Sequence, residues 1–358
     1  MFEIFIYSYF TSIYVFSAGI FFSFKILDLK NNNSLNLFQI GLYGIIFLSF
    51  IGLLVNFFYP LNKNINTFLF ILFIVYLLIK KHKINDVFIY SIITAFICVL
   101  ILTFDNTYRP DAGLYHLPYT NILNSEKIII GLSNIHFRFG HTSIIQYISA
   151  LNNNWIFNDK GILIPLSIIY AYFLLYLLSE IRIEKNKIVL FFNFLILCFL
   201  CLKLNRYSDF GNDAPAHIFY FFLICIALKN YNYFTKIQMG EILSLSAYII
   251  FNKITLFLGC FIPIILLFFK KKLVFLNLKV FLFLAFFSFA FFLKNFLVSG
   301  CLAFPIEQTC FTKVFWYDSQ EKRGSNAKIT MLENEAWTKG WSDQKENRKE
   351  FKEYLSNF

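Results

Sequence analysis

The chain has 358 residues, of which 58% are hydrophobic and 15% charged. Soluble globular domains carry roughly 25% charged residues, so this composition excludes an ordinary soluble domain. The net charge of +11 does not indicate nucleic-acid binding, because the inner loops of membrane proteins also collect Lys and Arg, and no basic soluble segment is present. The apolar residues instead form blocks long enough to cross a lipid bilayer.

These blocks predict ten membrane-spanning helices. A run of about 18 or more mostly apolar residues is typical of a transmembrane helix, and a helix satisfies its own backbone amides where lipid offers no water. The predicted spans cover residues 2–24, 37–58, 65–79, 87–104, 162–178, 188–204, 214–233, 240–251, 254–269 and 275–298. The expected fold class is therefore an all-α, polytopic membrane protein. An alternative is that 241–269 forms one helix kinked around Asn252-Lys253.

Segment 2–24 has no basic n-region and no small-residue cleavage site. We therefore expect it to be a retained first span rather than a removed signal peptide. It begins the first of four predicted regions. These are four spans in 1–104, an extracytoplasmic loop at 105–161, six spans in 162–298, and an extracytoplasmic polar tail at 299–358.

Charge in the short loops predicts the orientation of these regions. One set of loops carries 13 basic residues and the other carries seven before the tail, and the richer set is expected in the cytoplasm. Both termini would then lie outside, with the protein in a bacterial inner membrane. Within the outer loop, Ile128–Leu132 and Ser143–Leu151 are apolar but too short to span, which favours helices lying in the membrane interface.

The densest polar cluster follows the fourth predicted span, at 103–119. Asp111 and His116 are its candidate functional residues, with Tyr115 beside them. A carboxylate at the bilayer surface is suited to act as a general base or as a metal ligand. A salt bridge between Asp111 and Arg109 in an interfacial loop explains the same pattern equally well.

Two further clusters lie in segments predicted outside the cytoplasm. Arg138 is a candidate phosphate ligand, because a guanidinium binds two oxyanion oxygens, and a lipid headgroup would suit it equally. His136 and His141 are five positions apart, a poor spacing for a shared metal site on one helix. Asp213 begins the seventh predicted span, where it is either the N-cap of that helix or a second acidic site.

Lys253 and Lys294 lie near the outer ends of predicted spans. Each either snorkels to the membrane surface or binds a phosphate. Cys301 and Cys310 lie outside the apolar runs; beyond the cytoplasm we expect them to form a disulfide, whereas in the cytoplasm they would stay reduced. No P-loop, GxSxG, HExxH or GxGxxG motif occurs in a usable context, so cytosolic nucleotide chemistry is not indicated.

The order of these features resembles the GT-C superfamily of membrane glycosyltransferases, which use polyprenyl-phosphate sugars. The matching residues, within 103–310, are Asp111 with Tyr115-His116, Gly131 and His136, Lys253-Ile254-Thr255, and Lys294-Asn295 through Ser299-Gly300 with Pro305. The Asp…Tyr-His and Gly-Cys…Cys patterns are also similar to a family of bacterial multi-pass membrane proteins. The chain departs from the superfamily in having four spans before the acidic loop and none after the tail, so the resemblance implies a C-terminally shortened member.

The resemblance implies extracytoplasmic transfer of a sugar from a polyprenyl-phosphate donor to a glycan or lipid acceptor. The implied catalytic residues are Asp111 as base, Asp213 as a second acidic site, and His116. The implied lipid-phosphate ligands are Arg138, Lys253 and Lys294. These cations, or a divalent metal such as Mg²⁺ or Mn²⁺, would stabilise the leaving phosphate. A transporter or lipid flippase, which predicts charges deep within spans, and a non-catalytic membrane assembly protein are the alternatives.

Overall fold

A computed structural model of the chain is all-α and divides into two compact units. Unit 1 comprises Met1–Lys127 and Ser143–Ser288, and unit 2 comprises Ile128–Thr142 and Phe289–Phe358. The structure describes residues 1–29, 35–81, 83–104, 111–141, 143–204, 210–231, 235–270, 277–317, 326–340 and 355–356.

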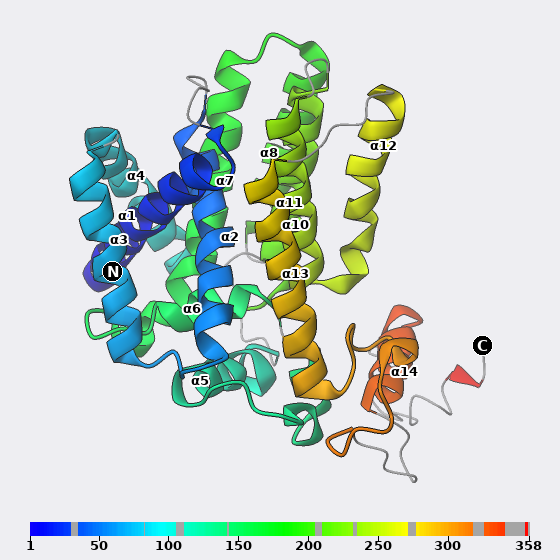
Figure 1. Cartoon of the computed structure of the whole chain (residues 1–358). Coiled ribbons are helices and arrows are strands. Elements are labelled where there is room, and N and C mark those ends of the chain that lie inside the picture. The colour runs from blue at the N-terminus through cyan, green and yellow to red at the C-terminus, as the bar shows by residue number, and fades with distance from the viewer. Residues whose placement is uncertain are drawn as a thin grey trace. The chain divides into compact units, whose positions relative to one another are not determined.

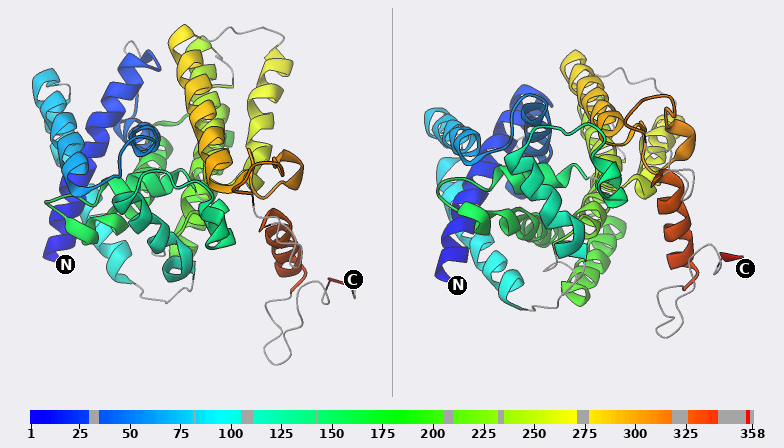
Figure 2. Two further views of the ribbon diagram at one scale, coloured as in Figure 1. Left: turned by 60° about the horizontal axis from the view of Figure 1, so that its bottom comes forward. Right: turned by 90° about the horizontal axis from the view of Figure 1, so that it is seen from below.

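Unit 1 is built from apolar helices joined mostly by short connections (Figure 1). In chain order they are α1 (Phe2–Lys25), α2 (Leu37–Asn56), α3 (Lys63–Lys80), α4 (Ile84–Phe104), α5 (Leu117–Ser125), α6 (Ile145–Leu151), α7 (Ile164–Ile183), α8 (Lys187–Leu202), α10 (Asp213–Lys229), α11 (Lys236–Asn252), α12 (Phe261–Lys270) and the first half of α13 (Leu278–Ser299). A π-helical turn, Ala112–His116, precedes α5, and 3-10 helices precede α7 (Asn158–Leu163) and α12 (Ile254–Cys260). Helix α1 packs against α2, α3 and α4 on one side of unit 1, with α12 on the other (Figure 2).

Six helical segments are long and apolar enough to cross a membrane, which indicates an integral membrane protein. They are Phe2–Lys25, Leu37–Asn56, Lys63–Lys80, Ile84–Phe104, Asn158–Ile183 and Leu278–Ser299. The other four ranges predicted as spans coincide with the shorter α8, α10, α11 and Ile254–Lys270. The described residues thus show six candidate spans.

Several helices begin at a side chain that caps their first turn. The Asn36, Asn62 and Asn186 side chains accept hydrogen bonds from backbone N–H groups at the starts of α2, α3 and α8. At α11, Thr235 and Gln238 form a reciprocal capping box. Such caps satisfy N–H groups that have no partner within the helix, so they define where the apolar runs become helical.

The segment 241–269 forms two antiparallel elements rather than one kinked helix. Helix α11 ends at Asn252, and Lys253 adopts an extended backbone conformation with φ −151° and ψ 107°. Ser246 then donates a hydrogen bond to the Gly259 carbonyl, 3.3 Å away, across the hairpin. The extended Lys253 is therefore the point at which the chain reverses.

Two glycines bring α1 and α2 into backbone contact. A Cβ atom placed on Gly19 would lie 2.0 Å from the Ile40 carbonyl oxygen, and one on Gly44 would lie 2.1 Å from the Val15 carbonyl oxygen. Backbone atoms of the two helices therefore touch where a side chain would otherwise separate them. Small residues serve this purpose at helix interfaces within membranes.

Gly19→Ala should lower the free energy of unfolding by about 3 kcal/mol, near the upper end for overpacking. The obstacle is a backbone oxygen, which cannot rotate away as a side chain would. Thermal unfolding of the detergent-solubilised protein would measure the change. The matched control is Gly113→Ala, because Gly113 is exposed and has nothing within 4 Å of the new methyl group. Equal stability of the two variants would contradict this packing.

Two of the expected interfacial helices differ in the structure. Ile128–Leu132 is not a helix: the chain turns there, with Gly131 at φ +71°, and only the short 3-10 helix Leu132–Asn134 follows. Ser143–Leu151 does contain α6, but every residue of α6 is buried. Helix α6 packs against α2 and α5, so it is part of the interior of unit 1 rather than an exposed amphipathic helix. A short apolar sequence such as Ser143–Leu151 suits a buried interior helix as well as an interfacial one, so the sequence could not decide between them.

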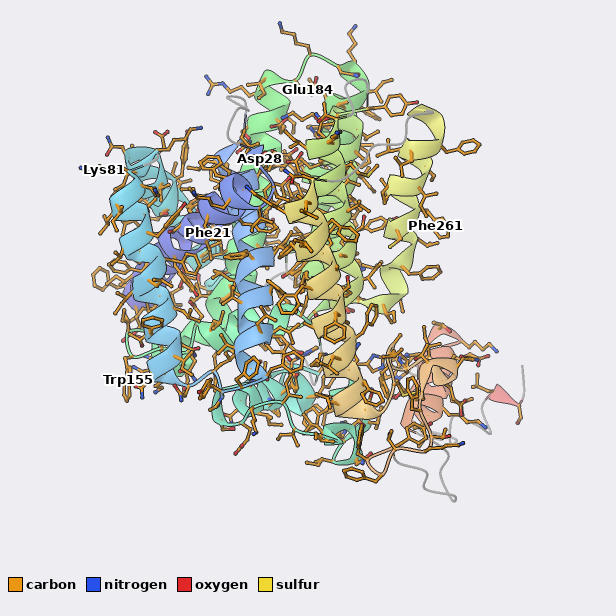
Figure 3. All side chains as sticks on the ribbon, viewed as in Figure 1. Phe21, Asp28, Lys81, Trp155, Glu184 and Phe261 are labelled. Carbon is orange, nitrogen blue, oxygen red and sulfur yellow. A yellow bond between two sulfur atoms is a disulfide. The ribbon has the colours of Figure 1, made fainter. Side chains whose placement is uncertain are left out.

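Polar groups lie at both ends of unit 1. Figure 3 shows Asp28, Lys81 and Glu184 at one end and Trp155 at the other. Trp155 is 61% exposed, and its indole N–H donates to the Asn64 side-chain oxygen at 2.7 Å. Exposed tryptophans that keep a polar partner are typical of membrane–water interfaces.

Candidate functional site

An ion pair joins two predicted site residues that are 40 positions apart in the chain. The Lys253 Nζ atom lies 2.6 Å from the Asp213 Oδ1 atom, and the two side chains are 31% and 40% exposed, respectively. Asp213 is the first residue of α10, and Lys253 is the extended residue after α11. The start of one helix and the end of the next therefore place a partly exposed cation beside a carboxylate.

Asp213 does not act as the N-cap of α10, which corrects that interpretation. The helix begins at Asp213 itself, and Asn212 occupies the N-cap position without a side-chain cap hydrogen bond. The carboxylate binds Lys253 instead. The Asp-Ala-Pro sequence resembles a helix start in either register, so the sequence alone could not separate these two roles.

A buried amide network lies directly beside this ion pair. The Asn252 Oδ1 atom accepts hydrogen bonds from the Ser143 hydroxyl at 2.9 Å and from the Ile145 N–H at 3.1 Å. The Asn252 carbonyl accepts a further one from the Asn212 side chain at 3.4 Å. These bonds attach the segment before α6 to the end of α11, and so they hold the backbone that carries Lys253.

His116 is linked to the same network through Gln146. The Gln146 Oε1 atom accepts from the Ser143 N–H at 2.9 Å, and its Nε2 atom lies 3.1 Å from His116 Nδ1. Because the amide nitrogen can only donate, Nδ1 accepts, which leaves the proton of a neutral imidazole on Nε2. That Nε2 atom faces Gly211, where an added Cβ would lie 3.6 Å away. His116 is therefore buried, is held by Gln146, and lies beside the segment that leads into Asp213.

Asp111 lies at the exposed beginning of the turn whose buried end is His116. The turn is π-helical: the Leu117 N–H donates to the Ala112 carbonyl, five residues earlier. Pro118 follows and has no N–H to continue an ordinary α-helical ladder. This local geometry places Asp111 at an exposed position and His116 at a buried one. The alternative partner proposed for Asp111, Arg109, lies outside the described residues.

In unit 2, the predicted phosphate ligand Arg138 already has an anionic partner. Its guanidinium lies 2.5 Å from the Glu333 carboxylate of α14 (Asn326–Thr338), with 22% and 13% of the two side chains exposed. Partial burial, together with the Arg138 charge, lowers the pKa of the neighbouring His136 imidazole. A phosphate at Arg138 would therefore have to displace or join a carboxylate.

The remaining predicted residues also belong to unit 2. Lys294 is buried in α13, and its Nζ atom lies 4.6 Å from the centroid of the Phe291 ring. A disulfide joins Cys301 to Cys310. His141 packs edge-on against Phe304 with ring centroids 5.3 Å apart, and His136 packs against Phe137 and Phe139. The histidines of this unit thus have aromatic neighbours.

The described residues do not form a cluster suited to a divalent metal. Across the described ranges, no three His, Cys, Asp or Glu side chains gather where they could hold an ion together. The Asp213 carboxylate, the best placed candidate, is already bound by Lys253. Lys253 is therefore the cation that the described structure places against this carboxylate.

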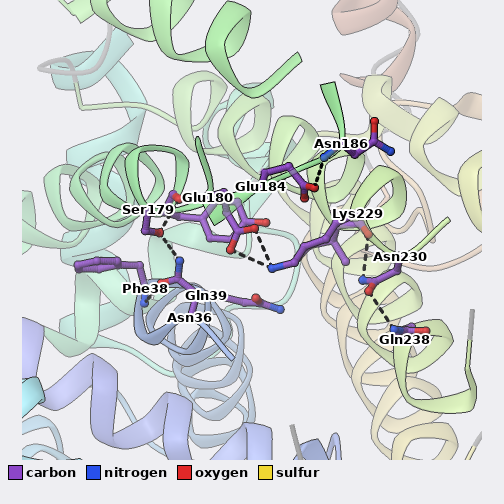
Figure 4. Close-up of polar contacts among 12 residues, drawn as sticks. Asn36, Phe38, Gln39, Ser179, Glu180, Glu184, Asn186, Lys229, Asn230 and Gln238 are labelled. Atoms are coloured by element: carbon purple, nitrogen blue, oxygen red, sulfur yellow. Dashed lines mark hydrogen bonds and ion pairs between the residues drawn. The ribbon is translucent and has the colours of Figure 1, made fainter. Parts of the chain in front are cut away.

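A second polar cluster, at the other end of α10, has no counterpart in the sequence-based prediction (Figure 4). The buried Glu180 carboxylate of α7 contacts the Lys229 Nζ atom at 2.7 Å and 2.9 Å through its two oxygens. Glu241 of α11 is also buried and accepts hydrogen bonds from the Tyr43 hydroxyl at 2.8 Å and the Gln39 amide at 3.1 Å. In the sequence, Glu180 and Glu241 each appear as a single glutamate at or near the edge of an apolar run, which does not indicate what they bind.

The chain belongs to the family DUF8201, described as a domain of unknown function, whose family model matches residues 1–357. The match includes both units, so the residues discussed above all fall within this one family region. No curated protein and no solved structure matches the chain. The family description names no activity, and a functional hypothesis therefore depends on the chemistry of the site.

Proposed function

We propose that this member of the DUF8201 family is a membrane glycosyltransferase that uses a polyprenyl-phosphate sugar and acts at the Asp213 end of α10. The observation that carries the proposal is the partly exposed Lys253–Asp213 pair, held by a buried Asn252–Gln146–His116 network among apolar helices. A cation accessible at the end of apolar helices suits a ligand that combines a phosphate with a long hydrocarbon chain.

The proposed topology has ten spans, in which α8, α10, α11 and Ile254–Lys270 cross the membrane together with the six long segments. Four spans lie in 1–104 and six in 162–298, while 105–161 and 299–358 lie outside the cytoplasm. The Lys-rich loops then face the cytoplasm, as the distribution of basic residues favours. Asp111, Asp213 and Lys253 would share the outer side of a bacterial inner membrane.

Lys253 is the proposed phosphate ligand. Its ammonium group is a compact charge on a flexible stem, and part of its surface remains exposed beside Asp213. When a phosphodiester approaches, Asp213 keeps the lysine charged and oriented, so Asp213 acts as a positioning residue in this scheme. Arg138 and Lys294 are retained as further phosphate candidates, with Arg138 acting only if the phosphate displaces or joins Glu333.

Asp111 is the proposed base because its carboxylate is exposed. It accepts the proton of an acceptor hydroxyl as that oxygen attacks the anomeric carbon of the sugar. The bond from that carbon to the phosphate oxygen breaks, and the phosphate leaves with the electron pair beside Lys253. His116, held by Gln146, orients the turn that carries Asp111. The acceptor is a glycan or a lipid hydroxyl.

Lys253→Met should weaken binding of a polyprenyl phosphate about tenfold or more, because a hydrogen bond to a charged group contributes about 1.5–3 kcal/mol and 1.4 kcal/mol corresponds to a factor of ten. Binding would be measured with the purified protein in nanodiscs. The control is Lys63→Met, which removes a half-buried lysine that binds Asn158 at 2.9 Å. No saturable binding by the wild type, or equal affinity in all three proteins, would contradict the phosphate assignment.

A lipid transporter or flippase is the second candidate function, and one observation favours it. Glu180, Glu241 and Lys229 are ionisable side chains among packed apolar helices, where such residues are functional hypotheses by default. This function predicts movement of a labelled polyprenyl phosphate between leaflets of a reconstituted vesicle with no chemical change. A non-catalytic assembly role predicts neither movement nor reaction.

A further inference from the structure

The chain that follows α13 folds back against the end of that helix instead of leaving it. The Trp316 indole N–H donates to the Phe296 carbonyl at 3.0 Å, and the Phe311 N–H donates to the Gly300 carbonyl at 2.9 Å. Gly300, at φ +75°, makes the turn possible, and the Cys301–Cys310 disulfide closes the loop. We call residues 300–317 the α13 loop.

The α13 loop exposes several large apolar side chains. Phe315 is 90% exposed, Phe311 50%, Leu302 40% and Ile306 38%. Lys313, also exposed, lies between the two phenylalanines in the sequence. Scattered apolar residues on a surface need no explanation, but this many within one short disulfide-closed loop indicate an interaction surface.

The position of the loop on α13 indicates what covers that surface. Phe289, Phe292 and Phe296 follow one another at i, i+3 and i+7, so they share one face of the helix. Phe289 and Phe292 are 62% and 37% exposed, as expected of side chains that meet lipid. The loop packs at the end of this face, because Phe311 and Trp316 each lie 5.3 Å from Phe296, ring centroid to ring centroid.

The contact at Phe296 also indicates the depth of the loop. Phe296 lies three residues before the end of α13, which is about 4.5 Å along the axis at 1.5 Å per residue. Because α13 is long and apolar enough to span the bilayer, its last turn lies near the boundary between acyl chains and headgroups. A loop folded back beside that turn lies at the same boundary.

We infer that the α13 loop is a membrane anchor whose apolar side chains insert among the phospholipids around the end of α13. Phe311 and Phe315 would enter the acyl-chain region, Trp316 would remain at the boundary, and Lys313 would meet the phosphate headgroups. The disulfide keeps the loop closed so that these side chains project together. This inference concerns attachment to the bilayer and holds whatever reaction the protein catalyses.

The test uses tryptophan fluorescence in full-length protein reconstituted with lipids brominated on their acyl chains. One reporter is Phe315→Trp in a background with Trp155, Trp316, Trp337 and Trp341 changed to Phe. A second keeps the natural Trp316 alone, which preserves its hydrogen bond. The control is Gln308→Trp in the tryptophan-free background, because Gln308 is exposed on the same loop.

Both reporters should be quenched by the brominated lipid about twofold more than the indole of the Gln308→Trp control, as expected of an interfacial apolar segment. Circular dichroism and size-exclusion profiles matching the wild type would show that each variant is folded. Quenching of the two reporters equal to that of the control would overturn the inference. So would reporters shielded from both brominated lipid and aqueous iodide, because that result would mean a protein partner covers the loop.

Discussion

Asp111→Asn should lower the rate of sugar transfer by about two to four orders of magnitude, the usual contribution of a general base. The amide has nearly the shape of the carboxylate but cannot take the acceptor proton. Asp111 is exposed, so the change should leave stability and donor binding intact. The transfer rate would be measured with saturating donor, which separates the chemical step from binding.

The matched control is Asp159→Asn, which neutralises another exposed carboxylate within 105–161. It should retain the wild-type rate. Full activity in Asp111→Asn would remove Asp111 from the mechanism. In that case Asp213→Asn becomes the informative variant, since Asp213 is the other carboxylate of the site and is partly exposed.

Lys229→Met should destabilise the folded protein by about 3–5 kcal/mol, the cost of leaving a buried charge without its partner. Glu180 is almost fully buried, and both of its oxygens contact the Lys229 ammonium group. Glu241 is buried on the neighbouring α11, where the Tyr43 hydroxyl and the Gln39 amide donate hydrogen bonds to it. Within the part of the chain that the structure describes, Lys229 is the cation paired with Glu180, so its removal leaves that buried carboxylate without its partner.

Thermal unfolding in detergent would compare Lys229→Met with Lys339→Met. Lys339, the residue after α14, pairs with Glu335 of that helix; the side chains are 35% and 52% exposed, and such pairs contribute at most about 1 kcal/mol. The double variant Lys229→Met/Glu180→Gln should recover part of the lost stability, because it removes the unpaired charge. Similar melting temperatures for Lys229→Met and Lys339→Met would contradict a buried ion pair.

The long helices were predictable because a long, continuous apolar run is compatible with few structures other than a helix. A helical segment lies at each of the ten predicted ranges, for example Leu37–Asn56 within the predicted 37–58. The short elements were less predictable. Ile128–Leu132 has an apolar composition like that of a helix, yet Gly131 turns the chain there. Over so few residues, tertiary contacts outweigh local preference.

The candidate site was predictable in its residue types but not in its geometry. Asp213 and Lys253 were both identified, but their pairing depends on the packing of α10 against α11. Gln146 and Asn252 were missed, because an amide inside or beside an apolar run carries no sign of what it binds. Their partners lie about 30 and 110 positions away, at His116 and Ser143.

The most direct measurement is the fate of a radiolabelled polyprenyl-phosphate sugar incubated with the purified protein in nanodiscs. A membrane glycosyltransferase should release free polyprenyl phosphate as the sugar passes to an added acceptor or to water. Release should depend on Asp111 and Lys253 and should persist in Asp159→Asn and Lys63→Met. An intact donor after prolonged incubation with protein that binds it would contradict the proposed transfer chemistry and favour the transporter.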